Sequence, residues 1–109
     1  MVRDDILFSV ETPLGFRVRT THIYWNFLVT EKHQAIAGRE NDVIQVLYDP
    51  DEVRSSRTDP LVFLFYRLER PGRWICVLAK RLDGEGFVVT AYPADAIKEG
   101  EIVWRRPRR

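Results

Sequence analysis

The chain has 109 residues, of which 45% are hydrophobic and 30% are charged, and its formal net charge is +1. This length supports one domain with one core, and the hydrophobic fraction excludes a disordered chain. The small net charge excludes a strong overall basic field of the kind that attracts nucleic acid.

The first predicted element is a short hairpin at the N-terminal end. Two segments with apolar residues, 6–10 and 16–19, flank the sequence Thr12-Pro13-Leu14-Gly15. Proline and glycine in such a connection are typical of a turn between two strands. Apolar and basic residues alternate in the second segment, so that strand has one apolar face.

Two helices are predicted after the hairpin. Thr20 or Thr21 suits the N-cap of a first helix that runs to about Ile36, with Gly38 just beyond its end. Apolar residues recur at helical spacing through this segment. A second helix over residues 40–48 ends before an Asp-Pro pair, because proline disfavours helical geometry in the residue that precedes it.

The second half of the chain changes to the two-residue period of β-strands. Strands are predicted at residues 52–56, 61–66, 73–80 and 86–92, joined by turns that contain proline or glycine. Short connections imply antiparallel neighbours. The expected fold class is therefore α+β: an N-terminal hairpin and two helices packed on a three- to five-stranded antiparallel sheet.

The sequence also bears on the domain organisation and location of the protein. We expect residues 1–109 to form one domain, with a basic C-terminal tail at residues 105–109 that is either solvated or in contact with phosphates. The single cysteine, Cys76, allows no internal disulfide, so we expect a reducing compartment, the cytoplasm. No apolar run approaches the about 20 residues of a membrane-spanning helix, so we expect no membrane association.

No standard motif for phosphate or metal binding stands in the sequence. The glycines form no phosphate-binding loop, and His22 and His33 are too far apart to be adjacent on one helix face. The polar candidates that remain are scattered along the chain: His22, Arg39, Ser55, Arg57, Tyr66, Arg67, Thr90 and Tyr92. Each of them also has an ordinary structural explanation, such as a local hydrogen bond or a preference for strands.

Together these residue types meet the needs of metal-free RNA cleavage. Histidine ordinarily titrates near neutral pH and suits an acid or base, and arginine presents a fixed fork of donors to a phosphate. The hydroxyl groups of Thr90 and Tyr92 project from the same face of one predicted strand. The RNA supplies its own 2′-hydroxyl nucleophile, so the protein must move protons and stabilise charge.

Several short motifs resemble those of a known superfamily, and they span roughly residues 18–93. In chain order they are Thr21-His22, Gly38-Arg39-Glu40, Asp49-Pro50-Asp51-Glu52-Val53, Leu64-Phe65-Tyr66-Arg67, Trp74-Ile75-Cys76-Val77-Leu78 and Phe87-Val88-Val89-Thr90-Ala91-Tyr92. This series resembles the small phage and bacterial nuclease-like domains of the barnase–EndoU–colicin E5/D–RelE superfamily, which includes many domains of unknown function.

The resemblance implies a metal-independent ribonuclease with a RelE- or barnase-like fold and no cofactor, in some cases the toxin of a toxin–antitoxin pair. The implied partners are RNA and a cognate antitoxin. By motif, the implied catalytic residues are His22, Tyr66 and Thr90, and the implied substrate-binding residues are Arg39, Arg57, Ser55 and Tyr92. This assignment predicts that His22, Arg39, Tyr66 and Thr90 converge in one cleft.

A non-catalytic module of the same fold, binding protein or nucleic acid, is the alternative interpretation. Its basis is the aromatic content of the predicted first helix and the C-terminal end, namely Tyr24, Trp25, Phe27 and Trp104. Exposure of these side chains would indicate a partner surface. A homodimer formed through an exposed strand is compatible with either function.

Overall fold

The computed structural model describes residues 5–97 and 99–107. Its strands are β1 (Ile6–Glu11), β2 (Arg17–Thr21), β3 (Glu52–Ser55), β4 (Val62–Arg70), β5 (Arg73–Leu82), β6 (Glu85–Ala94) and β7 (Glu101–Arg105). Its helices are α1 (His22–Phe27), a π-helical turn (Leu28–Lys32), a 3₁₀ turn (Gln34–Ile36) and α2 (Glu40–Tyr48). No helix in the described part of the chain is long and apolar enough to cross a membrane.

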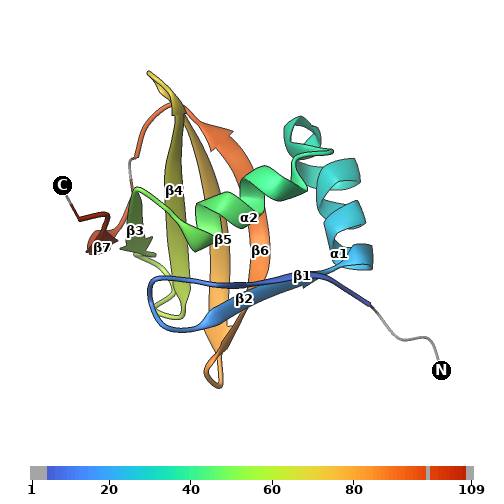
Figure 1. Cartoon of the computed structure of the whole chain (residues 1–109), viewed down its shortest axis with the longest axis horizontal. Coiled ribbons are helices and arrows are strands. Elements are labelled where there is room, and N and C mark those ends of the chain that lie inside the picture. Colours follow the sequence, from blue (N-terminus) through green and yellow to red (C-terminus); the bar gives the residue numbers. More distant parts are fainter. Residues whose placement is uncertain (1–4, 98, 108–109) are drawn as a thin grey trace.

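All strands belong to one seven-stranded mixed sheet in the order β1-β2-β6-β5-β4-β3-β7 (Figure 1). The predicted antiparallel sheet of three to five strands, with the hairpin packed on it, is therefore wrong. The hairpin itself is confirmed, but β2 joins the sheet by pairing parallel to β6, with Arg19 opposite Phe87. Short connections reveal antiparallel neighbours only, so this long-range parallel pair left no local signal in the sequence.

β7 is the second strand that the sequence reading missed. It pairs antiparallel with β3, so it lies at the sheet edge opposite the hairpin. Arg105, where the predicted tail begins, ends this strand and donates to Glu52, and Arg106 donates to the carbonyl oxygen of Asp49. The last two residues of the predicted tail, 108 and 109, lie outside the described residues.

The predicted first helix is broken into three short pieces. Thr21 caps α1 as expected, because its hydroxyl oxygen accepts the backbone N–H of Tyr24 at 3.1 Å. After Phe27 the chain widens into the π-helical turn, closed by the N–H of His33 donating to the Leu28 carbonyl at 2.8 Å. Such turns occur often at functional sites, and here the turn ends at a histidine.

The two faces of the sheet have separate clusters of buried side chains. The inner face carries the main core, which α2 covers with Val43, Val46 and Leu47 (Figure 1). The outer face carries a smaller cluster of Leu64, Tyr66 and Cys76. Side chains alternate between the faces along each strand, so the residues that follow one another in β4 and β5 supply both clusters.

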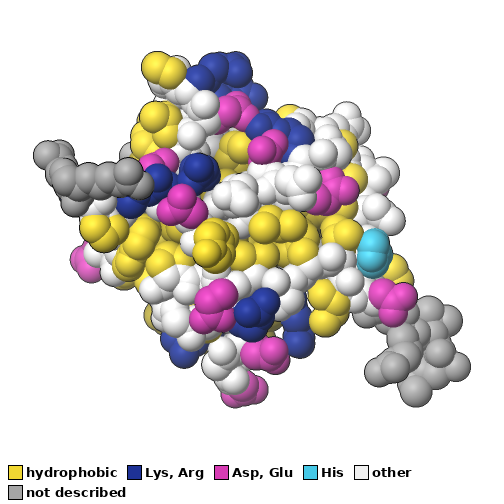
Figure 2. All heavy atoms as spheres, viewed as in Figure 1, with side chains coloured by type: hydrophobic (Ala, Val, Ile, Leu, Met, Phe, Trp, Pro, Cys, Tyr) yellow, Lys and Arg dark blue, Asp and Glu magenta, His cyan; other side chains and the backbone are white. Residues whose placement is uncertain are grey.

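The surface on the α2 side carries charges of both signs. Figure 2 shows a band of apolar side chains across the middle of this face, with Lys, Arg, Asp and Glu groups mixed on both sides of it. Mixed charges give no extended field of one sign.

The connection from β6 to β7 forms a strap over the outer face. β6 and β7 are separated by β5, β4 and β3 in the sheet, so the connection that includes residues 95–97 and 99–100 passes across these strands. Ile97 of the strap packs against the cluster that contains Tyr66 and Cys76. The strap thus forms one wall of a pocket on this face.

Candidate functional site

Two tyrosines and the cysteine form a row across three strands of the outer face. Tyr66 on β4 is opposite Cys76 on β5, which is in turn opposite Tyr92 on β6. Directly paired residues have their side chains on the same face and in contact range. The row therefore follows from strand register, and the sequence reading had picked two of its three members.

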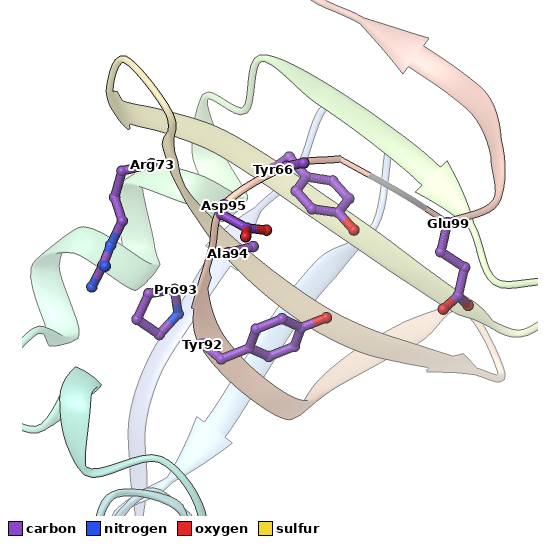
Figure 3. A pocket seen from close by; sticks show the side chains of 8 residues that line it. Tyr66, Arg73, Tyr92, Pro93, Ala94, Asp95 and Glu99 are labelled. Atoms are coloured by element: carbon purple, nitrogen blue, oxygen red, sulfur yellow. The ribbon is translucent and has the colours of Figure 1, made fainter.

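The row lies beneath a cavity of about 570 Å³, which we call the tyrosine pocket. It is lined by Tyr66, Arg73, Tyr92, Pro93, Ala94, Asp95, Ala96 and Glu99. Figure 3 shows both phenol groups reaching into it from β4 and β6, the strands on either side of β5, with Glu99 on the strap beyond them and Arg73 directed away.

Burial keeps this row uncharged at neutral pH. Desolvation raises the pKa of Tyr66 and of Tyr92 well above the ordinary value, and the nearby Cys76 and Glu99 raise both further. Desolvation also raises the pKa of the Cys76 thiol to about 12. Both phenols therefore remain hydrogen-bond donors, and the thiol is not a nucleophile under physiological conditions.

These shifts predict that alkali destabilises the protein in a defined range. In the unfolded chain the Cys76 thiol loses its proton near pH 9, whereas in the native state it does so near pH 12. The protonated Cys76 thiol therefore contributes its full stabilisation below about pH 9. As the pH rises toward 12 this contribution is lost, and the free energy of unfolding falls by up to about 1.4 kcal/mol per pH unit for this one proton. Cys76→Ser should lose stability less steeply over this interval in denaturant titrations; parallel curves would contradict the assignment.

His33 joins this site from the end of the π-helical turn. Its imidazole packs on the ring of Tyr92, with ring centroids 5.5 Å apart and planes inclined by 32°. His33 also lines a hollow of about 320 Å³, here called the histidine hollow, together with Tyr24, Phe27, Leu28, Lys32, Val89 and Thr90. The histidine hollow and the tyrosine pocket thus meet at the contact between His33 and Tyr92.

Thr90, which lines the histidine hollow, has a side-chain hydroxyl group that makes no hydrogen bond within the described residues. Its Oγ1 atom is buried. Burying a hydroxyl group without a partner costs about 1–3 kcal/mol, so such groups in native proteins call for an explanation.

The structure brings together three of the predicted site residues, Tyr66, Thr90 and Tyr92. His22 does not belong to this group: it is exposed at the start of α1, and its backbone N–H donates to the carbonyl of Asp5. The predicted convergence of His22 with the other residues is therefore not found. The histidine that lies beside this group is His33, which the sequence did not single out because the predicted helix ran unbroken through that position.

The predicted substrate-binding residues other than Tyr92 lie elsewhere. Arg39 is held on the α2 side by Asp42 and Glu69, and the hydrogen bond to Glu69 is the main cause of its raised pKa. Ser55 and Arg57 line a separate hollow of about 330 Å³ near the β3–β7 edge. An arginine already paired with two carboxylates is a structural anchor more than a free phosphate ligand.

Within residues 5–97 and 99–107, no three His, Cys, Asp or Glu side chains lie together as metal ligands. Comparison of the chain with protein-family models, with curated proteins and with solved structures returned no match.

Proposed function

We propose that this chain is a metal-independent endoribonuclease with His33 as its acid–base residue. The observation that carries the proposal is the packing of His33 on Tyr92, beside the unpartnered hydroxyl group of Thr90. One titratable group and several neutral donors meet here at the junction of two cavities. The sequence motifs that resemble the barnase–EndoU–colicin E5/D–RelE superfamily point to the same chemistry.

The arrangement suits transfer of a phosphoryl group within RNA. Neutral His33 takes the proton of the 2′-hydroxyl group, whose oxygen attacks the phosphorus atom. The bond to the 5′-oxygen breaks, and Tyr92, protonated because burial raises its pKa, donates a proton to that leaving oxygen. The products are a 2′,3′-cyclic phosphate and a 5′-hydroxyl group, and His33 returns its proton to solvent while Tyr92 regains one.

Two further groups are placed to stabilise the charge that develops on the phosphate. Lys32 lines the same hollow as His33 and Thr90, so its ammonium group is the local cation. The Thr90 hydroxyl group is a donor fixed in position on β6 before substrate arrives. Preorganised donors of this kind are usually the largest single contribution to such catalysis.

The direct test is cleavage of an end-labelled single-stranded RNA oligonucleotide in the presence of a metal chelator. Cleavage with 2′,3′-cyclic phosphate ends is expected, and a substrate with one 2′-deoxy residue at the cleaved position should resist. Purified, folded protein that leaves the RNA intact over a range of sequences would contradict the proposal. DNA of the same sequence serves as the control, because it has no 2′-hydroxyl nucleophile.

Thr90→Val separates the catalytic role of the hydroxyl group from any structural role. Valine has a similar shape and no unpartnered polar atom, so the free energy of unfolding should stay equal or rise by up to about 1 kcal/mol. Cleavage should fall by about 100-fold, as for loss of one donor to a developing charge. Denaturant titration and initial cleavage rates measure the two effects, and a variant both fully active and more stable would remove Thr90 from the site.

The cellular role that follows is that of a cytoplasmic toxin restrained by an antitoxin. Induced expression in bacteria should then arrest growth and break RNA, whereas His33→Ala should do neither while accumulating to the same level. The binding-module alternative keeps part of its basis, since Tyr24 and Phe27 are exposed, although Trp25 is buried. Normal growth and intact RNA with abundant wild-type protein would favour that alternative.

A further inference from the structure

A second hollow extends the candidate site along β6. It has a volume of about 310 Å³ and is lined by Arg19, Thr20, Thr21, Tyr24, Phe87, Val88 and Val89. It shares Tyr24 and Val89 with the histidine hollow, so the two hollows are adjacent between α1 and β6 and meet at the hydrogen bond from Tyr24 to the Val89 carbonyl. We call the part of these hollows formed by Tyr24, Phe27, Lys32, Phe87 and Arg19 the aromatic groove.

Register places this groove on the same face of the sheet as the tyrosine row. Phe87, Thr90 and Tyr92 of β6 are paired with alternate residues of β5, so their side chains share one face. β6 has a bulge between Phe87 and Tyr92, which pair with residues of β5 only four positions apart, so at about 3.3 Å per residue the two are about 13 Å apart. Stacked bases are about 3.4 Å apart along one strand, so the groove is long enough for more than one nucleotide.

Three aromatic rings in the groove are partly open to solvent. Tyr24 is 36% exposed, Phe27 43% and Phe87 40%. Tyr24 and Phe27 lie with their ring centroids 6.0 Å apart, and the Tyr24 hydroxyl group donates to the Val89 carbonyl at 2.7 Å. That hydrogen bond fixes the tyrosine against β6, so the ring is held ready for a ligand.

The charge of the groove complements a polyanion. Among the described residues that line the two hollows, the charged side chains are Arg19 and Lys32, both cations. The Lys32 ammonium group lies 5.9 Å from the centroid of the Phe27 ring, so a cation and an aromatic face are adjacent. Arg19 is 3.2 Å from Glu85, which leaves Lys32 as the stronger candidate for a phosphate.

We propose that the aromatic groove binds single-stranded RNA, with bases stacked on Tyr24, Phe27 and Phe87 and a phosphate at Lys32. The proposal deepens and rests on the ribonuclease function, because the groove leads directly to His33 and Thr90. Stacking on aromatic side chains combined with cations along the backbone is how proteins hold single strands without reading their sequence. A duplex hides its base faces, so the groove selects single strands.

Binding without cleavage tests this groove. A short fluorescein-labelled 2′-O-methyl oligoribonucleotide lacks the nucleophile, and its anisotropy gives Kd. Tyr24→Ala, Phe27→Ala and Phe87→Ala should each raise Kd by about 5- to 100-fold, as for loss of one base stack. Lys32→Ala should lower the slope of log K against log salt by about 0.7. Tyr48→Ala is the matched control, an exposed residue outside the groove, and should bind as wild type.

The outcomes distinguish this proposal from the ribonuclease function. Wild-type binding by all the groove variants, or no binding by the wild type, overturns the groove even if RNA is cleaved. Tight binding through the groove without cleavage of ordinary RNA supports the groove and overturns the ribonuclease. Equal affinity for a duplex and a single strand would also overturn the proposal that the groove binds single-stranded RNA. So would groove variants that no longer self-associate but bind RNA as the wild type does, because the groove would then be an interface between copies of the chain. Tyr24→Phe keeps the ring and should retain binding, which covers the case in which Tyr24→Ala does not fold.

Discussion

Replacing His33 with alanine is expected to lower the rate of RNA cleavage by about 100- to 10,000-fold, the usual contribution of a positioned general acid or base. His33 is the titratable group that packs on Tyr92 and lines the hollow with Thr90. His22→Ala is the matched control, since that residue is exposed at the start of α1. Exposed residues without such contacts change stability by less than about 0.5 kcal/mol, so its activity should equal that of the wild type.

Two further measurements separate a catalytic role of His33 from a structural one. His33→Gln keeps a polar side chain of similar length, so the contact with Tyr92 and the melting temperature should change little while cleavage is lost. A histidine base stops working when it is protonated, so the acidic limb of the wild-type pH–rate profile should be missing from any residual activity of the variant. An active His33→Ala, or an inactive but folded His22→Ala, would return the assignment to His22.

The elements that sequence reasoning predicted correctly are those set by local chemistry. The turn at Pro13 and Gly15, the end of α2 before the Asp-Pro pair and the alternation along β4 to β6 each depend on a few neighbouring residues. The same alternation correctly placed Thr90 and Tyr92 on one face. Register then added Cys76, because once β5 is paired on both sides its middle residue falls between the two tyrosines.

The misses depend on interactions between residues far apart in the chain. The parallel pair of β2 with β6 brings Arg19 beside Phe87, and no spacing rule connects these residues. The apolar residues of the π-helical turn before His33 are spaced as in an α-helix. The spacing therefore predicted one continuous helix and gave no sign of the turn. β7 is short and ends in arginines, a composition equally typical of a solvated tail.

The placement of β7 also gives the largest expected effect on stability, at Gly100. This residue has φ of +84°, and a Cβ atom added there would overlap the carbonyl oxygen of Ser55 on β3. The left-handed conformation alone costs about 1–2 kcal/mol for alanine, and a clash with backbone cannot be relieved by rotating a side chain. Gly100→Ala should therefore lower the free energy of unfolding by about 3 kcal/mol or more, and the melting temperature by more than about 10 °C.

Gly72→Ala is the control that separates the clash with Ser55 from the cost of placing alanine in the left-handed conformation. Gly72 has a similar φ of +76°, but an added Cβ would meet nothing within 4 Å, so a loss of only about 1–2 kcal/mol is expected. In Gly100→Ala, hydrogen exchange should quicken first at Ile102 and Trp104 of β7, while β4 and β5 stay protected. The strap that carries Glu99 ends at Gly100, so RNA cleavage by the folded fraction should fall in this variant and not in Gly72→Ala. Equal destabilisation by the two substitutions would mean that β7 does not pair with β3 in solution, and the tyrosine pocket would then lose its outer wall.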